Sequence, residues 1–260
     1  MTESPYTADF FKTGLAHSYA SAKRIVPLVL GILPVRSVLD VGCGRGDFLR
    51  AFLEAGVADI TGLDGAHVPR DQLVIDESVF HAVDLAHGFD FGRRYDLVVS
   101  LEVAEHLPAD SADAFVDSLV RHGSVILFSA AVPHQDGTGH LNEQWPSYWA
   151  TRFGRHGYKL YDLLRPMIWG DQQVAWWYRQ NALLFATDAV AAASPQLAAA
   201  SRLPITMLNM VHPQLYLAQA ELLRTIAAQI RDLQGLLRQS TSFEVAHLAD
   251  GRMTITPKRG

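Results

Sequence analysis

The sequence has only one cysteine, Cys43, among 260 residues. A single cysteine cannot form an intrachain disulfide, and such usage is typical of a reducing compartment. We therefore expect a cytoplasmic protein that is held together by its apolar core. With 49% hydrophobic residues the chain has the means to build one.

Long apolar runs and an excess of positive charge are also missing. The most apolar early run, residues 25–33, contains Pro27 and Gly31, whereas a membrane-spanning helix needs about 20 apolar residues. We expect no secretory signal, because residues 1–23 lack an uninterrupted apolar segment. The net charge is −5, with Lys and Arg scattered, whereas a surface for long nucleic acids is basic. These absences predict a protein whose partner is neither a membrane nor a long nucleic acid.

What the sequence does contain is a glycine turn between a predicted strand and a predicted helix. The run Val38-Leu39-Asp40-Val41-Gly42-Cys43-Gly44-Arg45-Gly46 passes from apolar residues to alternate glycines. Glycines have no Cβ, so we expect backbone N–H groups at the helix N-terminus to be open to a ligand. The dinucleotide fingerprint G-x-G-x-x-G/A fails, because its third small residue would fall on Asp47 or Leu49. A nicotinamide oxidoreductase is therefore disfavoured.

Two acidic residues accompany this turn. Asp40 stands two residues before the first glycine, where a carboxylate suits a positively charged ligand and repels a pyrophosphate. Asp64 ends the next predicted strand, about 20 residues after the turn, where a carboxylate accepts hydrogen bonds from both ribose hydroxyls. An aspartate before a glycine, here Gly65, is also a common turn pair. The preceding Asp40 turn favours the ribose contact.

From Val35 onward, predicted strands and helices alternate, which indicates βαβ units and a parallel sheet. Polar residues gather after the third and fourth strands, at the sheet edge where α/β proteins bind ligands. The predicted strands lie near residues 36–41, 59–63, 79–83, 95–101, 124–129, 158–162 and 180–186, and the predicted helices near 46–55, 67–73, 110–121 and 146–156.

Together, the motifs resemble those of class I S-adenosylmethionine-dependent methyltransferases. Asp40-x-Gly42-x-Gly44-x-Gly46 resembles the first motif of that class. EVAEHLP at 102–108, SAAVP at 129–133 and GHLNEQWP at 139–146 are similar to a bacterial group of such enzymes, and the resemblance spans roughly residues 17–187. It implies an α/β, Rossmann-like seven-stranded sheet with helices on both faces and an antiparallel last strand. The implied cofactor is S-adenosylmethionine, held by Asp40, Gly42, Cys43, Gly44, Gly46, Asp64, Gly65, Asp84 (at the adenine amino group), Leu85, Leu101, Glu102 and His106.

Around this domain we predict two additions. The divisions are an N-terminal helical cap at 1–34, the cofactor-binding domain at 35–187, a C-terminal helical appendage at 188–240 and a tail at 241–260. Aromatic residues in the cap either pack in the core or close the cofactor site: Tyr6, Phe10, Phe11 and Tyr19. A narrow apolar seam with 3-4 spacing marks the appendage, at Leu223, Ile226, Ile230, Leu233 and Leu237. Docking on the same chain and a homodimer contact are both open for this seam.

Methyl transfer to a hydroxyl needs an aligned acceptor and a base that works near neutral pH. His140 is the first candidate, because its loop faces the carboxyl edge of the sheet. His106 and then His134 follow, and the resemblance implies that Glu102 shapes the site. Aromatic residues supply stacking walls for a sugar or aromatic acceptor, although most of them belong to the core: Trp145, Tyr148, Trp149, Trp169, Trp176, Trp177 and Tyr178. We expect O-methylation of a small-molecule or glycan hydroxyl.

Several alternatives remain open. N- or C-methylation would depend less on His140 as a base, and this residue would then only stabilise its loop. A non-catalytic protein that binds S-adenosylmethionine would retain the glycine turn but transfer no methyl group. The set Glu102, Glu105, His106 and His140 resembles the metal ligands of small-RNA 2′-O-methyltransferases, and a divalent ion there would lower the pKa of acceptor hydroxyls. The chain lacks the basic tract that such an RNA substrate requires.

Overall fold

A computed structural model describes residues 15–200, 207–239, 243–247 and 253–257. The chain divides into two compact units, residues 1–212 and 213–260, and each is described by itself. Of the aromatic residues expected in the N-terminal cap, Tyr6, Phe10 and Phe11 lie outside the described residues.

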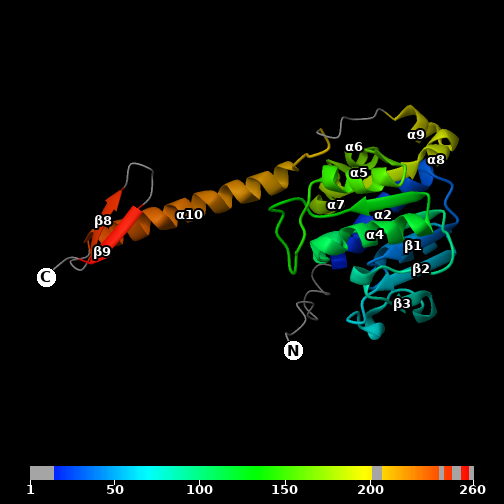
Figure 1. The fold of residues 1–260 in the computed structure, drawn as a ribbon, viewed down its shortest axis with the longest axis horizontal. Coiled ribbons are helices and arrows are strands. Elements are labelled where there is room, and N and C mark those ends of the chain that lie inside the picture. Colours follow the sequence, from blue (N-terminus) through cyan, green and yellow to red (C-terminus); the bar gives the residue numbers. More distant parts are fainter. Residues whose placement is uncertain (1–14, 201–206, 240–242, 248–252, 258–260) are drawn as a thin grey trace. The chain divides into compact units, whose positions relative to one another are not determined.

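Seven strands of the first unit form one sheet in the order β3-β2-β1-β4-β5-β7-β6 (Figure 1). The strands from β3 to β5 run parallel, whereas β7 runs antiparallel to both β5 and β6. This arrangement confirms the predicted Rossmann-like sheet with a reversed last strand. The strands are β1 (Ser37–Val41), β2 (Asp59–Asp64), β3 (Phe80–Ala82), β4 (Leu97–Leu101), β5 (Val125–Ser129), β6 (Tyr158–Tyr161) and β7 (Leu183–Thr187).

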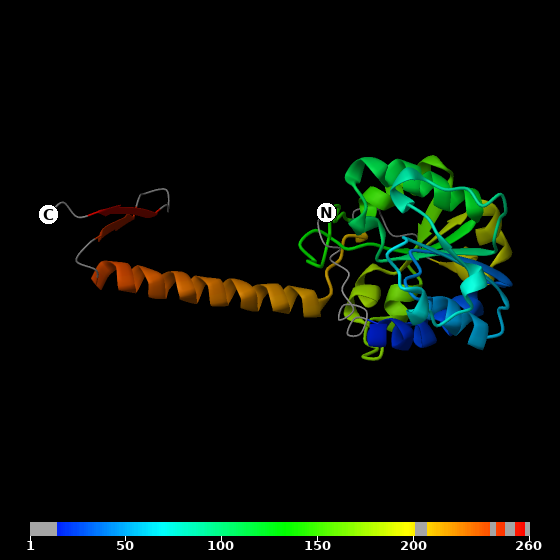
Figure 2. The ribbon, with the colours of Figure 1, turned by 90° about the horizontal axis from the view of Figure 1, so that it is seen from below.

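Helices cover both faces of the sheet (Figures 1 and 2). Side chains alternate along each strand, so in β1 Val38 enters one core and Leu39 the other. The core of Val38 is shared with α2 (Leu15–Ile32), α3 (Asp47–Glu54), α6 (Leu164–Ile168), α7 (Trp176–Asn181), α8 (Asp188–Ala193) and α9 (Pro195–Ala199). The core of Leu39 is shared with α4 (Ala112–His122) and α5 (Pro146–Arg155).

Two predicted elements are wrong in type or in extent. Residues 67–73 contain only a single 3₁₀ turn, η1 (Arg70–Gln72), because Pro69 lacks an N–H donor and disfavours helical conformation in the residue before it. The strand predicted at 180–186 begins at Leu183, and residues 180 and 181 end helix α7 instead. The other 3₁₀ turns are η2 (Glu77–Val79), η3 (Leu85–His87), η4 (Ala104–His106) and η5 (Ala109–Ser111).

A buried arginine of α6 forms an ion pair at the start of that helix and a hydrogen bond to the segment at residue 208. Arg165 is 1% exposed, and its Nε and Nη2 donate to the carboxylate of Asp162 at 2.8 and 2.6 Å. Its Nη1 also donates to the carbonyl of Leu208 at 3.1 Å. The guanidinium therefore neutralises a buried acid and fixes the last stretch of the first unit.

We expect Arg165→Met to lower the free energy of unfolding by about 3–5 kcal/mol, because the variant leaves the Asp162 carboxylate buried without its counter-ion. Arg155→Met is the matched control. Arg155 pairs with Asp113, both side chains being 58% exposed, so its loss should cost less than about 1 kcal/mol. Denaturant unfolding measures both values, and equal losses would contradict the role given to Arg165.

The second unit consists of α10 (Pro213–Gln239) and an antiparallel pair of strands, β8 (Phe243–His247) and β9 (Met253–Pro257). Strand β8 contacts α10. None of the described helices, in either unit, combines the length and apolarity that a bilayer crossing requires.

Candidate active site

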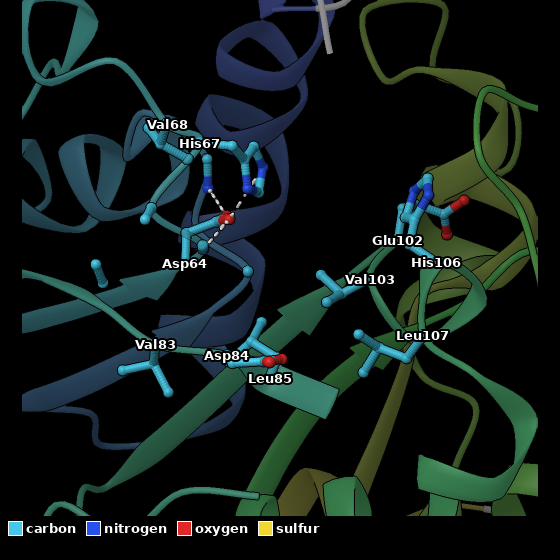
Figure 3. Close-up of a pocket in the computed structure, with 15 residues that line it drawn as sticks. Asp64, His67, Val68, Val83, Asp84, Leu85, Glu102, Val103, His106 and Leu107 are labelled. Carbon is cyan, nitrogen blue, oxygen red and sulfur yellow. Dashed lines mark hydrogen bonds and ion pairs between the residues drawn. The ribbon is translucent and has the colours of Figure 1, made fainter. Parts of the chain in front are cut away.

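Two cavities open where the parallel strands end. The first has a volume of about 600 Å³ and is lined by residues that follow β1, β2, β3 and β4 (Figure 3). The second has a volume of about 410 Å³ and is lined by the glycine turn, the loop after β5 and helix α7. Gly42, Gly44, Glu102 and His106 line both cavities, so the cavities meet at these residues.

The three glycines of the turn all have positive φ, namely 80° at Gly42, 54° at Gly44 and 94° at Gly46. A Cβ on Gly42 would lie 2.2 Å from Val103 Cγ2, and one on Gly46 would lie 2.8 Å from the Ile75 side chain. A Cβ on Gly44 would meet no atom within 4 Å, and would stand in the space where the cavities meet. Gly42 and Gly46 therefore serve close packing, whereas Gly44 leaves room for a ligand.

The sequence predicts that the backbone amides of the turn are open to a ligand, but the structure engages four of them in hydrogen bonds within the chain. The amides of Gly42 and Cys43 donate to the Leu63 carbonyl, that of Gly46 to the Cys43 carbonyl, and that of Gly44 to Asp64 Oδ2 at 2.7 Å. These bonds hold the turn against the end of β2. A turn with its amides engaged in this way is unsuited to a pyrophosphate, in agreement with the failed dinucleotide fingerprint.

Asp64 lies at the end of β2 with its carboxylate in the first cavity (Figure 3). It accepts hydrogen bonds from the amides of Gly44 at 2.7 Å and Gly65 at 2.6 Å, and His67 Nε2 lies 3.6 Å away. Burial raises its pKa, and the two amides and His67 oppose that shift. A carboxylate has about four acceptor sites, so this one retains capacity for two ligand hydroxyls.

Asp84 lines the far part of the first cavity with the buried Leu85. The Asp84 side chain is 68% exposed, and it accepts hydrogen bonds from the Ala86 amide at 3.0 Å and His87 Nδ1 at 2.8 Å. These two bonds lower its pKa, the amide more than the imidazole. Asp84 therefore caps the 3₁₀ turn η3 and presents an ionised acid at the cavity rim.

Asp40 is a buried acid that lines the second cavity. It is 3% exposed, and burial, followed by the nearby Asp64 and Asp47 carboxylates, raises its pKa well above the ordinary value. Within the described part of the chain no residue forms a hydrogen bond or ion pair with its carboxylate. A ligand ammonium is the group that such a site accommodates.

Glu102 stands between the two cavities in a strained conformation. Its φ is 56°, which is uncommon for a non-glycine residue. Its carboxylate accepts hydrogen bonds from Asn181 Nδ2 at 3.0 Å and Gln135 Nε2 at 2.9 Å. Burial raises its pKa, against the effect of these amides and of Ser129. The amides fix the carboxylate at the junction of the cavities.

The amide network behind Glu102 was not foreseen from the sequence. Gln180 Nε2 donates to Gln135 Oε1 at 3.0 Å, and Asn181 Nδ2 donates to the same oxygen at 2.9 Å. Gln180 Oε1 in turn accepts the His212 amide at 2.7 Å. The sequence contains one signal of this network, the polar run Arg179-Gln180-Asn181 shortly before the apolar β7. Amide side chains that become buried need hydrogen-bond partners.

Glu105, His106 and His140 form a cluster at the edge of the second cavity. Their candidate ligand atoms all lie within 4.8 Å of one another, and the two imidazole rings meet edge to face with centroids 4.8 Å apart. Burial, aided by Glu102, raises the pKa of Glu105 well above its usual range. Burial, aided by His140, lowers the pKa of His106 to about 4. The His106 imidazole is therefore neutral near pH 7.

His140 is oriented by an acid of its own loop. Its Nδ1 lies 2.8 Å from Glu143 Oε1, and its side chain is 12% exposed. Glu143 also accepts the amides of Asp136 at 2.9 Å and His134 at 2.7 Å. One carboxylate thus closes the loop and holds the imidazole, which lines the second cavity. His134, the third predicted base, lines neither cavity.

The expectation that most of the seven aromatic residues belong to the core is not met, because only Trp149 and Tyr178 are buried. Trp176, Trp177 and Tyr178 line the second cavity. Trp149 is 2% exposed and packs against Phe128 in the core, and Trp169 packs on His212. Of the predicted cofactor residues, all except Gly46 line one of the two cavities. Asp47 and Phe48 also line the second and were missed.

The residues present fit S-adenosylmethionine. The open position at Gly44 leaves space for it, Asp64 offers acceptors for a ribose, and the buried Asp40 carboxylate suits its ammonium group. The Asp84 carboxylate, at the rim of the first cavity, is able to accept the adenine amino group.

Comparisons with known proteins agree with this architecture. A family model described as a methyltransferase domain matches residues 16–164. The ubiquinone biosynthesis O-methyltransferase of Proteus mirabilis (strain HI4320) is 32% identical over 121 residues, which are 41% of this chain and 49% of that protein. The enzyme of the same name from Bordetella avium (strain 197N) is 33% identical over 109 residues, 38% of this chain and 44% of that protein. The chain thus matches about half the length of these curated relatives.

Two solved structures share the fold. The sugar N-methyltransferase KedS8 from Streptoalloteichus sp ATCC 53650 superposes with a TM-score of 0.53 at 17% identity, covering 70% of this chain and 93% of that one. DesVI from Streptomyces venezuelae gives a TM-score of 0.50 at 18% identity, covering 69% and 96%. At these identities the likeness concerns the fold alone.

Proposed function

This chain belongs to the methyltransferase-domain family, as a class I S-adenosylmethionine-dependent methyltransferase, and from that premise we propose that it methylates a hydroxyl of a small molecule or glycan. The proposal rests on one observation. The second cavity holds an imidazole oriented by a carboxylate, His140 with Glu143, and this cavity meets the first at Gly42, Gly44, Glu102 and His106. An acceptor bound there would have a base on one side and the methyl donor on the other.

When bound, S-adenosylmethionine supplies a methyl group activated by positively charged sulfur. The chain's own residues supply position and a proton acceptor. Asp64 would hold the ribose, Asp84 the adenine amino group and Asp40 the ammonium group. His140 takes the acceptor proton at Nε2, because its Nδ1 faces Glu143. Glu143 fixes the tautomer and stabilises the imidazolium that forms.

The described lining of the second cavity disfavours an anionic acceptor. Trp176 and Trp177 offer faces on which a sugar or aromatic ring can stack. Among the residues that the structure describes, the lining contains no lysine or arginine, and a phosphorylated or carboxylated acceptor would need one or the other. The names of the curated relatives favour oxygen as the methylated atom, although the match covers about half of their length.

The test is binding followed by transfer. Calorimetric titration with S-adenosylmethionine should show micromolar affinity, after which neutral polyhydroxylated acceptors are screened for the mass of one added methyl group. Matched aminated acceptors are the comparison. Methylation of amines alone would replace the proposal by N-methylation, binding without transfer to any acceptor would favour a regulatory protein, and no binding would overturn it.

A second candidate is metal-assisted transfer, favoured by the state of Glu105. Its side chain is fully buried, and neither carboxylate oxygen accepts a well-formed hydrogen bond from the described residues. A divalent cation held by Glu105, His106 and His140 would satisfy that carboxylate and lower the pKa of an acceptor hydroxyl. Glu102, the fourth ligand expected from the sequence, lies outside this cluster and is engaged by amides.

We expect chelator-treated protein to bind Mn²⁺ or Mg²⁺ in calorimetry if this candidate is right, and Glu105→Gln to lose that binding. The raised pKa of Glu105 fixes the sign of the pH dependence. Binding must release its proton, so the affinity for the metal rises with pH. Methyl transfer at full rate in chelator, with no metal binding, would leave His140 as a simple base.

A further inference from the structure

Helix α10 of the second unit carries a row of exposed apolar side chains. Leu223, Ile226, Ile230 and Leu233 are 67%, 41%, 46% and 58% exposed. Their 3-4 spacing is that of positions a and d in a heptad. Tyr216, which is 66% exposed, extends position a by one heptad upstream. Positions a and d from residue 216 to residue 237, about three heptads, are then apolar except for Gln219 at position d of the first heptad.

The flanks of this seam carry no charge. The charged residues between 213 and 237 all fall at heptad positions b, c and f, on the side away from the seam: Glu221, Arg224, Arg231 and Asp232. Positions e and g, which border the seam, hold only leucine, alanine and glutamine. Two copies of this helix can therefore approach along the seam without repulsion between like charges.

The flanking residues also match one another in a parallel pair. In parallel coiled coils, position g of one helix faces position e of the next heptad on its partner. With this register Leu222 faces Ala227, and Gln229 faces Gln234. Each large apolar side chain meets a small one, and each amide meets an amide. An antiparallel pair would lose these matches, because g would then face g.

The end of the unit provides an independent observation. Strands β8 and β9 form a two-stranded sheet in which β8 contacts α10, and a sheet of only two strands gains stability from further packing. Both of its outer edges lack a neighbouring strand among the described residues. A parallel pair of α10 helices would bring two such sheets to the same end, where each gives the other a surface or an edge.

We propose that α10 forms a parallel two-stranded coiled coil with α10 of a second copy of this chain, which makes the protein a homodimer. The seam of one copy packs against the same seam of the other copy, and a two-fold axis that runs along the helices relates the two copies. Residues Leu223 to Leu237 supply its core, and the strands β8 and β9 meet at its C-terminal end.

The first test is the mass of the full chain in solution, by light scattering coupled to size exclusion. We expect twice the 28.7 kDa of one chain. Ile230→Asp places a charge in the seam and should give the monomer mass. Leu217→Asp is the matched control, because Leu217 is 63% exposed on the same helix but at position b, and it should remain dimeric. A monomeric full chain, as expected if α10 docks on its own first unit, overturns the proposal.

A second test fixes the orientation. Leu233→Cys places a thiol at position d, where a parallel pair sets it opposite its own copy. The native Cys43 is buried, so mild oxidation should produce covalent dimers through residue 233 alone. In an antiparallel pair centred on the seam, residue 233 faces the other end of the helix. A dimer that fails to cross-link, or one that survives Ile230→Asp, would contradict the parallel seam. Unchanged S-adenosylmethionine binding in each variant shows that the first unit remains folded.

Discussion

S-adenosylmethionine binding is expected to weaken by roughly a hundredfold or more in the Asp64→Ala variant. The carboxylate would accept two ribose hydroxyls, and each hydrogen bond to a charged group contributes about 1.5–3 kcal/mol. The variant also removes the acceptor of the Gly44 and Gly65 amides, which hold the glycine turn against β2. At about 1.4 kcal/mol per tenfold change, both hydroxyls together exceed a hundredfold in affinity. Calorimetric titration measures this directly.

Two variants serve as controls for this loss. Asp64→Asn keeps one acceptor oxygen and the shape of the side chain, so it should bind more tightly than Asp64→Ala but more weakly than the natural protein. Asp84→Ala removes an acid whose side chain is 68% exposed, where water competes for the ligand, and should cost less than about tenfold. An equal loss of affinity in the Asp64 and Asp84 variants would show that the loss comes from removing any negative charge near the cavity and not from a ribose contact. Undiminished affinity for S-adenosylmethionine in Asp64→Ala would rule out the proposed contact between Asp64 and the ribose.

The parts of this protein that the sequence predicts are those governed by local pattern. The turn from β1 to α3 follows from alternate glycines after an apolar run, and Asp64 from its place at the end of the next strand. The alternation of strands and helices predicts a parallel sheet, whereas its seven strands and reversed last strand are implied by the resemblance to the methyltransferase class. The 3₁₀ turn at Arg70–Gln72 stands where the pattern predicts a longer helix, because Pro69 lacks an N–H donor and disfavours helical conformation in the residue before it.

The surroundings of Glu102 lay beyond such reasoning. Its partners Gln135 and Asn181 are 33 and 79 residues away in sequence, and no local pattern links them. Asn181 also ends a helix in a segment that resembles the start of a strand. The positive φ of Glu102 arises from tertiary constraint, since its amide is held by Ser129. Strain of this kind is stored where the surrounding structure compensates for it.

The geometry of the second cavity favours a histidine over the acids as the candidate base. The Glu102 carboxylate is engaged by the amides of Gln135 and Asn181, and the buried Asp40 carboxylate is the one that suits the ligand ammonium. The pKa of His106, at about 4, makes that imidazole a poor proton acceptor near pH 7. His140 differs in having a carboxylate partner at 2.8 Å, which orients its imidazole in the second cavity.

His140→Gln is therefore expected to lower kcat for a hydroxyl acceptor by about 10²–10⁴-fold, the usual contribution of a general base. The affinity for S-adenosylmethionine should stay within about threefold, because the cofactor contacts proposed at Asp40, Asp64 and Asp84 do not include His140, whose imidazole is held by Glu143. Single-turnover methyl transfer with saturating acceptor measures the first effect, and calorimetry the second. A parallel loss of cofactor affinity would indicate that His140 mainly supports the structure of its loop.

The comparison with His134 makes this assignment specific. His134 lies in the same loop with a φ of 65° but lines neither cavity, and asparagine tolerates that conformation. His134→Asn should keep its activity, and a loss there would reassign the base. His140→Ala should recover activity with added imidazole, because a free base can replace a proton acceptor. Recovery on addition of Mn²⁺ instead would mean that His140 acts as a ligand beside Glu105 and His106, and the transfer would then depend on the metal.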